Sequence, residues 1–325
     1  MYPRLSDLFS DLFGIAFPFP IYSFGFMVAI ALMSAAWLLQ QEFDRLYRAG
    51  KMSSVRIPDP ERDKGRKKGK VRYVAASPAN LVGTITVLAI VSGFAGAKLF
   101  HILENLDSFF VDPLGMIFSK GGFTFYGGLI AGAVVVTRYV KKKGLSVTRV
   151  IDAAAPGLML AYGIGRIGCH LAGDGDWGIA ADLTSKPDWL PMWLWAETYP
   201  NNILGIDLSA NPVYPTPIYE FVAAAILFGI LLSLRDHAHR AGWLFSLYLA
   251  LNGLERFVIE KIRVNNEFDL LGLSVTQAEV IAVLLMLVGC IGMWKTWSKS
   301  ESAGEAVQRG GPTTPERQAR VPADV

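Results

Sequence analysis

The feature of this sequence that most limits its fold is a series of apolar stretches about 20 residues long, the length a helix needs to cross ~30 Å of hydrocarbon. Seven such stretches are found, at roughly 20–39, 80–103, 122–140, 150–170, 216–234, 242–262 and 275–295. Only 18% of the 325 residues are charged, whereas soluble domains usually carry about 25%. We therefore predict an all-α polytopic membrane protein with seven transmembrane helices, and a soluble enzyme is disfavoured.

The connecting segments predict the orientation of these spans. Loop 41–79 contains eleven Lys and Arg, whereas loop 171–214 has one Lys against six acids. Basic residues also gather at 138–149 and 235–241 and after residue 295. Because basic loops stay in the cytoplasm, seven spans place the N-terminus outside and the C-terminus in the cytoplasm.

The remaining segments have distinct expected roles around a membrane domain at 20–295. Residues 1–19 predict an interfacial N-terminal helix, because their apolar side chains recur at helical spacing. Loop 171–214 is rich in Trp and predicts a small periplasmic cap at the bilayer surface. Residues 296–325 have the composition of a disordered cytoplasmic tail. The basic loop 41–79 is interpreted as a solvated face near anionic lipids, with no role in binding nucleic acid.

The two cysteines, Cys169 and Cys290, lie far apart in apolar segments. This spacing gives neither a disulfide framework nor a metal motif. No nucleotide motif is found in the sequence either. We therefore expect no metal and no other cofactor.

Ionisable groups inside the predicted spans gather at one depth. A charged group in a span costs roughly 2.5–3.5 kcal/mol, so it usually has a partner or a function. On the predicted topology, five spans place such groups near their outer ends: Lys98 and His101, Tyr126, Arg166 and His170, Glu220, and Arg256 with Glu260. This clustering predicts a site in the outer leaflet. A transporter is disfavoured, because it would need a polar path to both faces of the membrane. The sequence also contains no internal repeat of the kind that builds many transporters.

Two arginines at headgroup depth are suited to a phosphate, because a guanidinium binds its oxygens bidentately. Structural alternatives stay open. Arg256 and Glu260, four residues apart, could form an intramembrane ion pair. Tyr126 could be an interfacial anchor, and Lys98 could snorkel to the headgroups. His170 could be a satisfied polar group near the surface, and Asp174 with its neighbour Asp176 could make turns.

Four segments, in order along the chain, resemble signatures of the bacterial prolipoprotein diacylglyceryl transferases. Residues 165–174 read Gly-Arg-Ile-Gly-Cys-His-Leu-Ala-Gly-Asp, similar to the family's Gly-Arg-x-Gly-Asn-Phe-x-Asn-x-Glu. Residues 123–130 resemble its Ser-Phe-His-Gly-Gly-Leu segment, and residues 214–220 its His-Pro-Thr-Gln-Leu-Tyr-Glu segment. Residues 256–263 match Arg-Phe-x-x-Glu-x-x-Arg. The resemblance extends from about residue 20 to 295.

The resemblance implies an enzyme of the bacterial cytoplasmic (inner) membrane whose active site faces the periplasm. Such enzymes transfer diacylglycerol from phosphatidylglycerol to the lipobox cysteine in the signal peptide of a prolipoprotein. The partners implied are phosphatidylglycerol, that signal peptide and membrane lipids. Two alternatives are a related lipid transferase with another acceptor and a non-catalytic lipid-binding or transport protein.

The resemblance also implies roles for individual residues. Arg166 would bind the lipid phosphate, Arg256 would stabilise phosphate or leaving group, and Glu220 and Glu260 would orient these arginines or hold the glycerol headgroup. The expected catalytic set is Tyr126, Arg166, His170, Arg256 and Glu260. The expected substrate-binding set is Arg166, Gly168, Asp174, Glu220, Lys98 and Asn252.

The chain departs from the family pattern at the expected base. Tyr126 replaces the family's histidine, and at neutral pH a tyrosine is a poorer base than a histidine. Cys169, Asp174 and Asn252 replace the family's asparagine, glutamate and tyrosine. We hypothesise that His170 supplies the missing base.

This hypothesis predicts that His170→Ala abolishes transfer to a lipobox peptide, while Tyr126→Phe leaves much of it. The measurement is the mass gain of the peptide after incubation with phosphatidylglycerol. The reverse result would remove His170 from the mechanism.

Overall fold

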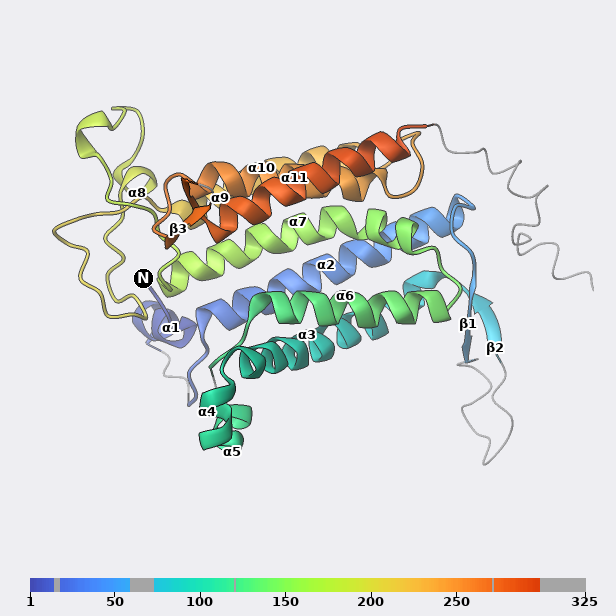
Figure 1. The fold of residues 1–325 in the computed structure, drawn as a ribbon, viewed down its shortest axis with the longest axis horizontal. Helices are drawn as coiled ribbons and strands as arrows, with labels where there is room; N and C mark the ends of the chain where they lie inside the picture. The colour runs from blue at the N-terminus through green and yellow to red at the C-terminus, as the bar shows by residue number, and fades with distance from the viewer. Residues whose placement is uncertain (15–17, 59–72, 120, 271, 299–325) are drawn as a thin grey trace, which may run out of the picture. The chain divides into compact units, whose positions relative to one another are not determined.

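The computed structural model describes residues 1–14, 18–58, 73–119, 121–270 and 272–298 (Figure 1). The chain divides into two compact units. Among the described residues, the first unit comprises Met1–Leu38 and the chain from Ile151 onward, and the second comprises Leu39–Val150. Most of the predicted tail, and part of the basic loop 41–79, lie outside the described residues.

The first unit is built from long apolar helices. Its helices are α1 (Leu5–Phe13), most of α2 (Ser23–Arg48), nearly all of α7 (Val147–Ala172), α8 (Met192–Trp195), α9 (Thr216–Ser233), α10 (Trp243–Glu260) and α11 (Gln277–Thr296). A short 3-10 helix, η2 (Leu183–Ser185), and an antiparallel hairpin of β3 (Glu267–Leu270) and β4 (Leu273–Thr276) complete it. Helices α7, α9 and α10 share a buried core that includes Met159, Leu231 and Leu244.

The second unit pairs two long helices. It contains the hairpin of β1 (Val55–Pro58) and β2 (Tyr73–Ala76), η1 (Pro78–Leu81), α3 (Val82–Glu104), α4 (Leu106–Val111), α5 (Pro113–Phe118) and α6 (Phe125–Lys142). Helices α3 and α6 approach closely because glycines face each other. A Cβ on Gly128 would lie 2.9 Å from the carbonyl oxygen of Gly93.

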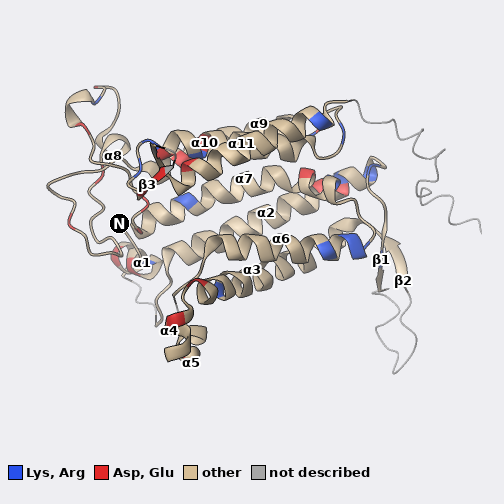
Figure 2. Ribbon diagram, viewed as in Figure 1, with Lys and Arg blue, Asp and Glu red and all other residues tan. Residues whose placement is uncertain are grey.

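Five helical segments are long and apolar enough to span a membrane: Ser23–Arg48, Pro78–Glu104, Val147–Ala172, Thr216–Ser233 and Gln277–Thr296. The other two predicted spans correspond to α6 and α10, which have 18 residues each and include three charged residues each. The long helices are uncharged through their middle turns, and their charges lie near the ends (Figure 2). The fold is therefore mostly helical with five candidate spans, and the count of seven stays a prediction.

Two of the segments expected outside the spans, 1–19 and 171–214, contain described structure. Helix α1 covers Leu5–Phe13 of the predicted interfacial helix and leaves Leu12 and Phe13 exposed. The predicted cap, 171–214, is tied together by isolated bridges of Val213 with Ala180 and Glu197. A further bridge, between Gly178 and Arg263, joins this cap to the end of α10.

We predict that Gly253→Val destabilises the first unit. Helices α10 and α11 meet at this glycine, where an added Cβ would lie 2.6 Å from the carbonyl oxygen of Ala282. Such overpacking costs about 1–3 kcal/mol, so thermal unfolding in detergent should show a Tm lower by several degrees. The matched control is Gly229→Val in α9, where a Cβ meets nothing within 4 Å. Equal Tm changes in the two variants would contradict this packing.

Candidate active site

Three arginines of the first unit converge on one buried carboxylate, Glu220 of α9, which is 0% exposed. Arg166 of α7 places Nε 3.0 Å from Glu220 Oε2. Arg256 of α10 places Nη1 3.4 Å from Oε1. Arg263, which follows α10, places Nη1 3.5 Å from the same Oε1. Residues far apart in the sequence are thus held together by one acid.

Two further acids balance the charge of the arginines. Asp176 forms ion pairs with Arg166 through Oδ2 and with Arg263 through Oδ1. Glu260 Oε2 lies 2.7 Å from Arg256 Nη2. Three guanidiniums therefore contact three carboxylates, an arrangement that offsets the cost of burying each charge alone.

Asp176 follows α7 in a turn, and its environment keeps it ionised. Although burial opposes the effect, the guanidiniums of Arg263 and Arg166 hold the pKa of Asp176 below its ordinary value. Burial, together with the neighbouring Asp176 carboxylate, raises the pKa of Asp174. The two carboxyls of this turn are thus in different environments, and Asp176 is the one that forms ion pairs with the arginines.

Two further side chains, Tyr162 and Glu255, contact this cluster. The ring of Tyr162 lies under the Arg166 guanidinium, 5.1 Å from centroid to Cζ. Its hydroxyl lies 3.3 Å from Glu220 Oε1 and 3.1 Å from Glu255 Oε2. Sequence analysis missed both Tyr162 and Glu255. Glu255 could have been found by the rule that found Glu220, since it is also an acid within an apolar stretch.

Four of the predicted residues are brought together: Arg166, Glu220, Arg256 and Glu260. Gly168 allows α2 to pack closely, because its Cβ would lie 3.1 Å from that of Met27. Asp174 accepts a hydrogen bond from the amide of Asp176 at 3.3 Å, the turn contact that was the alternative interpretation. Asn252 lies on α10 one turn before Arg256 and is half-buried.

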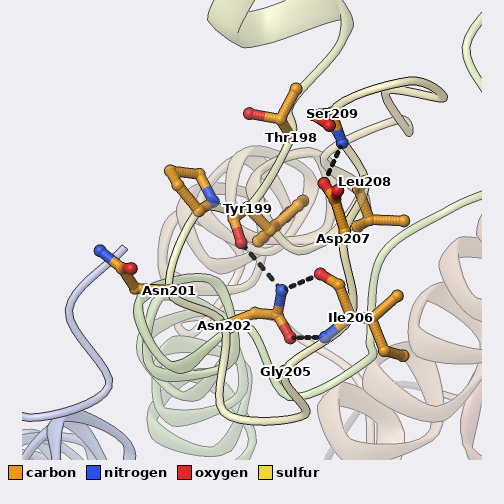
Figure 3. Close-up of a pocket in the computed structure, with 10 residues that line it drawn as sticks. Thr198, Tyr199, Asn201, Asn202, Gly205, Ile206, Asp207, Leu208 and Ser209 are labelled. Atoms are coloured by element: carbon orange, nitrogen blue, oxygen red, sulfur yellow. Dashed lines mark hydrogen bonds between the residues drawn. The ribbon is translucent and has the colours of Figure 1, made fainter.

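His170 contacts the cap. Its Nδ1 lies 3.1 Å from the hydroxyl of Tyr199, which is 1% exposed. Tyr199 begins a loop closed by Asn202, whose side chain donates to the carbonyl oxygens of Tyr199 and Ile206 (Figure 3). This loop lines an open pocket of about 300 Å³. His170 thus holds the cap to the end of α7, and its role as a base stays a prediction.

Lys98 and Tyr126 belong to the second unit. Lys98 donates to Ser119 Oγ at 2.6 Å and to the carbonyl oxygen of Gly121 at 2.9 Å. Its ammonium also lies over the ring of Phe123. Lys98 therefore holds the segment that leads into α6. Tyr126 lies in the first turn of α6 and is 39% exposed. Their roles toward substrate stay predictions.

One group of side chains has the residue types of a metal site. Ligand atoms of Cys169, Asp174 and Asp176 lie within 4.8 Å of one another. Both oxygens of Asp176, however, are ion-paired with Arg166 and Arg263. Two adjacent guanidiniums repel a cation and compete for this carboxylate, so the group does not fit a divalent ion.

Comparison with known proteins shows the family of this chain. The model of the family described as prolipoprotein diacylglyceryl transferase matches residues 65–295. The chain belongs to this family. It is 25% identical to a phosphatidylglycerol–prolipoprotein diacylglyceryl transferase of Leptospira interrogans over 93% of the chain and 97% of the relative. Relatives of the same name from Clostridium tetani (27% identical, 86% and 93% covered) and Frankia alni (34% identical, 67% and 57% covered) also match.

We predict that Glu220→Gln strongly destabilises the first unit. The change leaves three buried guanidiniums with two carboxylates, and breaking a buried ion pair costs about 3–5 kcal/mol. The Tm in detergent should fall by about 5 °C or more. Glu267→Gln on the exposed strand β3 is the matched control and should leave the Tm nearly unchanged. A Glu220→Gln protein as stable as the control would show that this carboxylate does not hold the arginines.

Proposed function

We propose that this protein transfers the diacylglyceryl group of phosphatidylglycerol to the lipobox cysteine thiol of prolipoproteins. Family membership and the names of the relatives support the reaction. The observation that carries the proposal is the convergence of Arg166, Arg256 and Arg263 around Glu220. Such a set of guanidiniums suits an anionic phosphate headgroup.

Two of the three arginines are the better candidates for lipid contact. The side chains of Arg166 and Arg256 are 17% and 22% exposed, whereas Arg263 is 8% exposed. The ion pairs to Glu220, Asp176 and Glu260 fix the guanidiniums before substrate arrives. Donors fixed in this way cost little reorganisation when charge develops on the phosphate.

In the reaction we propose, the cysteine thiol loses its proton and attacks the glycerol carbon bonded to the phosphate oxygen. The carbon–oxygen bond breaks, and its electron pair leaves with glycerol phosphate. Arg166 and Arg256 stabilise this growing negative charge in a water-poor pocket.

We further propose seven spans, with α6 and α10 as the additional two, in a bacterial cytoplasmic membrane with the N-terminus outside. In the first unit, the basic turn 235–241 lies between the C-terminus of α9 and the N-terminus of α10, and the arginine cluster lies at the opposite ends of these helices. The positive-inside rule assigns that turn to the cytoplasm. The cluster and the cap joined to it then face the periplasm.

We predict that Arg166→Ala and Arg256→Ala each lower transfer by about 10²-fold or more, the usual loss when one stabilising donor is removed. The assay combines purified full-length protein, phosphatidylglycerol liposomes and a lipobox peptide, and it measures a mass gain of one diacylglyceryl group. Arg235→Ala, at the opposite end of α9, is the matched control and should retain full activity.

The outcomes of this assay separate the candidate functions. Peptide modification that is lost in both variants supports the transfer and the phosphate-binding role. Binding of phosphatidylglycerol without peptide modification overturns the prolipoprotein acceptor. That result would favour a transferase with another acceptor or a non-catalytic lipid-binding protein. The replacements at Tyr126 and Cys169 are the specific features that make another acceptor worth testing.

A further inference from the structure

Tyr162 connects two carboxyl groups that come from different helices. Its hydroxyl lies 3.3 Å from Glu220 Oε1, and 3.3 Å and 3.1 Å from Oε1 and Oε2 of Glu255. Glu255 is only 7% exposed. Three carboxylate oxygens of two acids thus surround a single hydroxyl in a buried setting.

This network can take up a proton. A phenol hydroxyl donates one hydrogen bond, and an ionised carboxylate only accepts. When Glu220 and Glu255 are both ionised, the Tyr162 hydroxyl can donate its proton to only one of them. The other carboxylate then faces the lone pairs of the Tyr162 oxygen. A proton added to Glu255 lets Glu255 donate to Tyr162 while Tyr162 donates to Glu220. One extra proton therefore completes the network, and buried polar groups strongly favour such completion.

The charges around Glu255 also favour its protonation. Arg166, Arg256 and Arg263 are already matched by Glu220, Asp176 and Glu260. Glu255 is a fourth acid whose hydrogen-bond partner, among the described residues, is the Tyr162 hydroxyl. An ionised Glu255 thus leaves the cluster with one excess negative charge. A lipid phosphate bound to the arginines would add another, which further favours proton uptake.

We propose that Glu255 accepts the proton released by the attacking thiol and that Tyr162 relays it. This assignment rests on the proposed diacylglyceryl transfer. The charged and titratable groups facing Glu255 are Tyr162 and Arg166 from α7, Glu220 from α9 and the adjacent Arg256 of α10. Tyr162 is next to the proposed phosphate site, because its ring centroid lies 5.1 Å from the Arg166 guanidinium carbon.

The step is balanced in atoms and electrons. The S–H bond of the thiol breaks, the S–C bond to glycerol forms, and the C–O bond to the phosphate breaks with its electron pair on the phosphate. The oxygen of Tyr162 receives the thiol proton and passes its own to Glu255. Glu255 releases the proton to water after glycerol phosphate leaves.

The alternative acceptor is His170. Its Nδ1 faces Tyr199, and its described contacts tie it to the cap. Glu255, by contrast, is linked through Tyr162 to both Glu220 and Arg166. If Glu255 is the proton acceptor, Glu255→Gln should lose the pH dependence of transfer. If His170 is the acceptor, His170→Ala should lose it.

The experiment compares Glu255→Gln with wild type in liposomes, measuring the single-turnover rate of peptide modification from pH 5 to pH 9. Glutamine keeps the size and hydrogen bonds with Tyr162 but takes up no proton. We expect the rate of Glu255→Gln to be lower than that of wild type by about 10²-fold or more, the usual contribution of a positioned base. Binding of phosphatidylglycerol should be unchanged. The wild-type rate should fall as Glu255 becomes protonated in acid, and this fall should be absent in Glu255→Gln. Glu255→Asp should restore part of the rate, and the control Glu267→Gln should behave as wild type.

Three results would overturn the proposal. They are an unchanged rate and pH profile in Glu255→Gln, a loss of rate that parallels a loss of lipid binding and of Tm, and loss of the acid fall in His170→Ala instead. Infrared spectroscopy of the protein alone separates this proposal from the proposed function. A carboxylic-acid band that appears on acidification in wild type, and is missing in Glu255→Gln, identifies the proton site even in a protein that modifies no peptide. Absence of a difference between their spectra overturns it.

Discussion

The first unit depends on one interaction, the burial of the Glu220 carboxylate among three guanidiniums. A fully buried carboxylate is costly unless charges and hydrogen bonds compensate it. Here the compensation comes from Arg166 at the end of α7 and from Arg256 and Arg263 at the end of α10. The ends of α7, α9 and α10 must therefore meet at one place, and the close contact of α10 with α11 at Gly253 extends this arrangement to the last helix.

The same neutralised cluster determines what the site can bind. With Asp176 and Glu260 included, the three guanidiniums are paired with three carboxylates before any ligand arrives. A bound phosphate would therefore contact guanidinium donors whose directions are already fixed, and not unpaired positive charges. Such preorganisation favours states in which negative charge develops on the phosphate, including the transition state of its departure.

Much of this site could be predicted from sequence, because a charged residue in an apolar stretch is rarely placed there without a partner. That rule found Arg166, Glu220, Arg256 and Glu260. Depth alone does not specify partners, however. Lys98 and His170, at the same predicted depth, hold a loop and the cap. Tyr162 was missed because a tyrosine among apolar residues gives no signal until α7, α9 and α10 are packed together.

The cap shows why contacts outside the helices were hardest to predict. Asp176 was interpreted as a turn residue, and it does lie in a turn, but that turn returns the chain to the end of α7 and pairs with two arginines. The backbone then passes beside the end of α10, where Gly178 bridges Arg263. An added Cβ at Gly178 would lie 2.6 Å from the carbonyl oxygen of Ile262. Only glycine at this position therefore lets the two backbones come so close. The position of the Asp176 carboxylate thus depends on a backbone contact two residues further along.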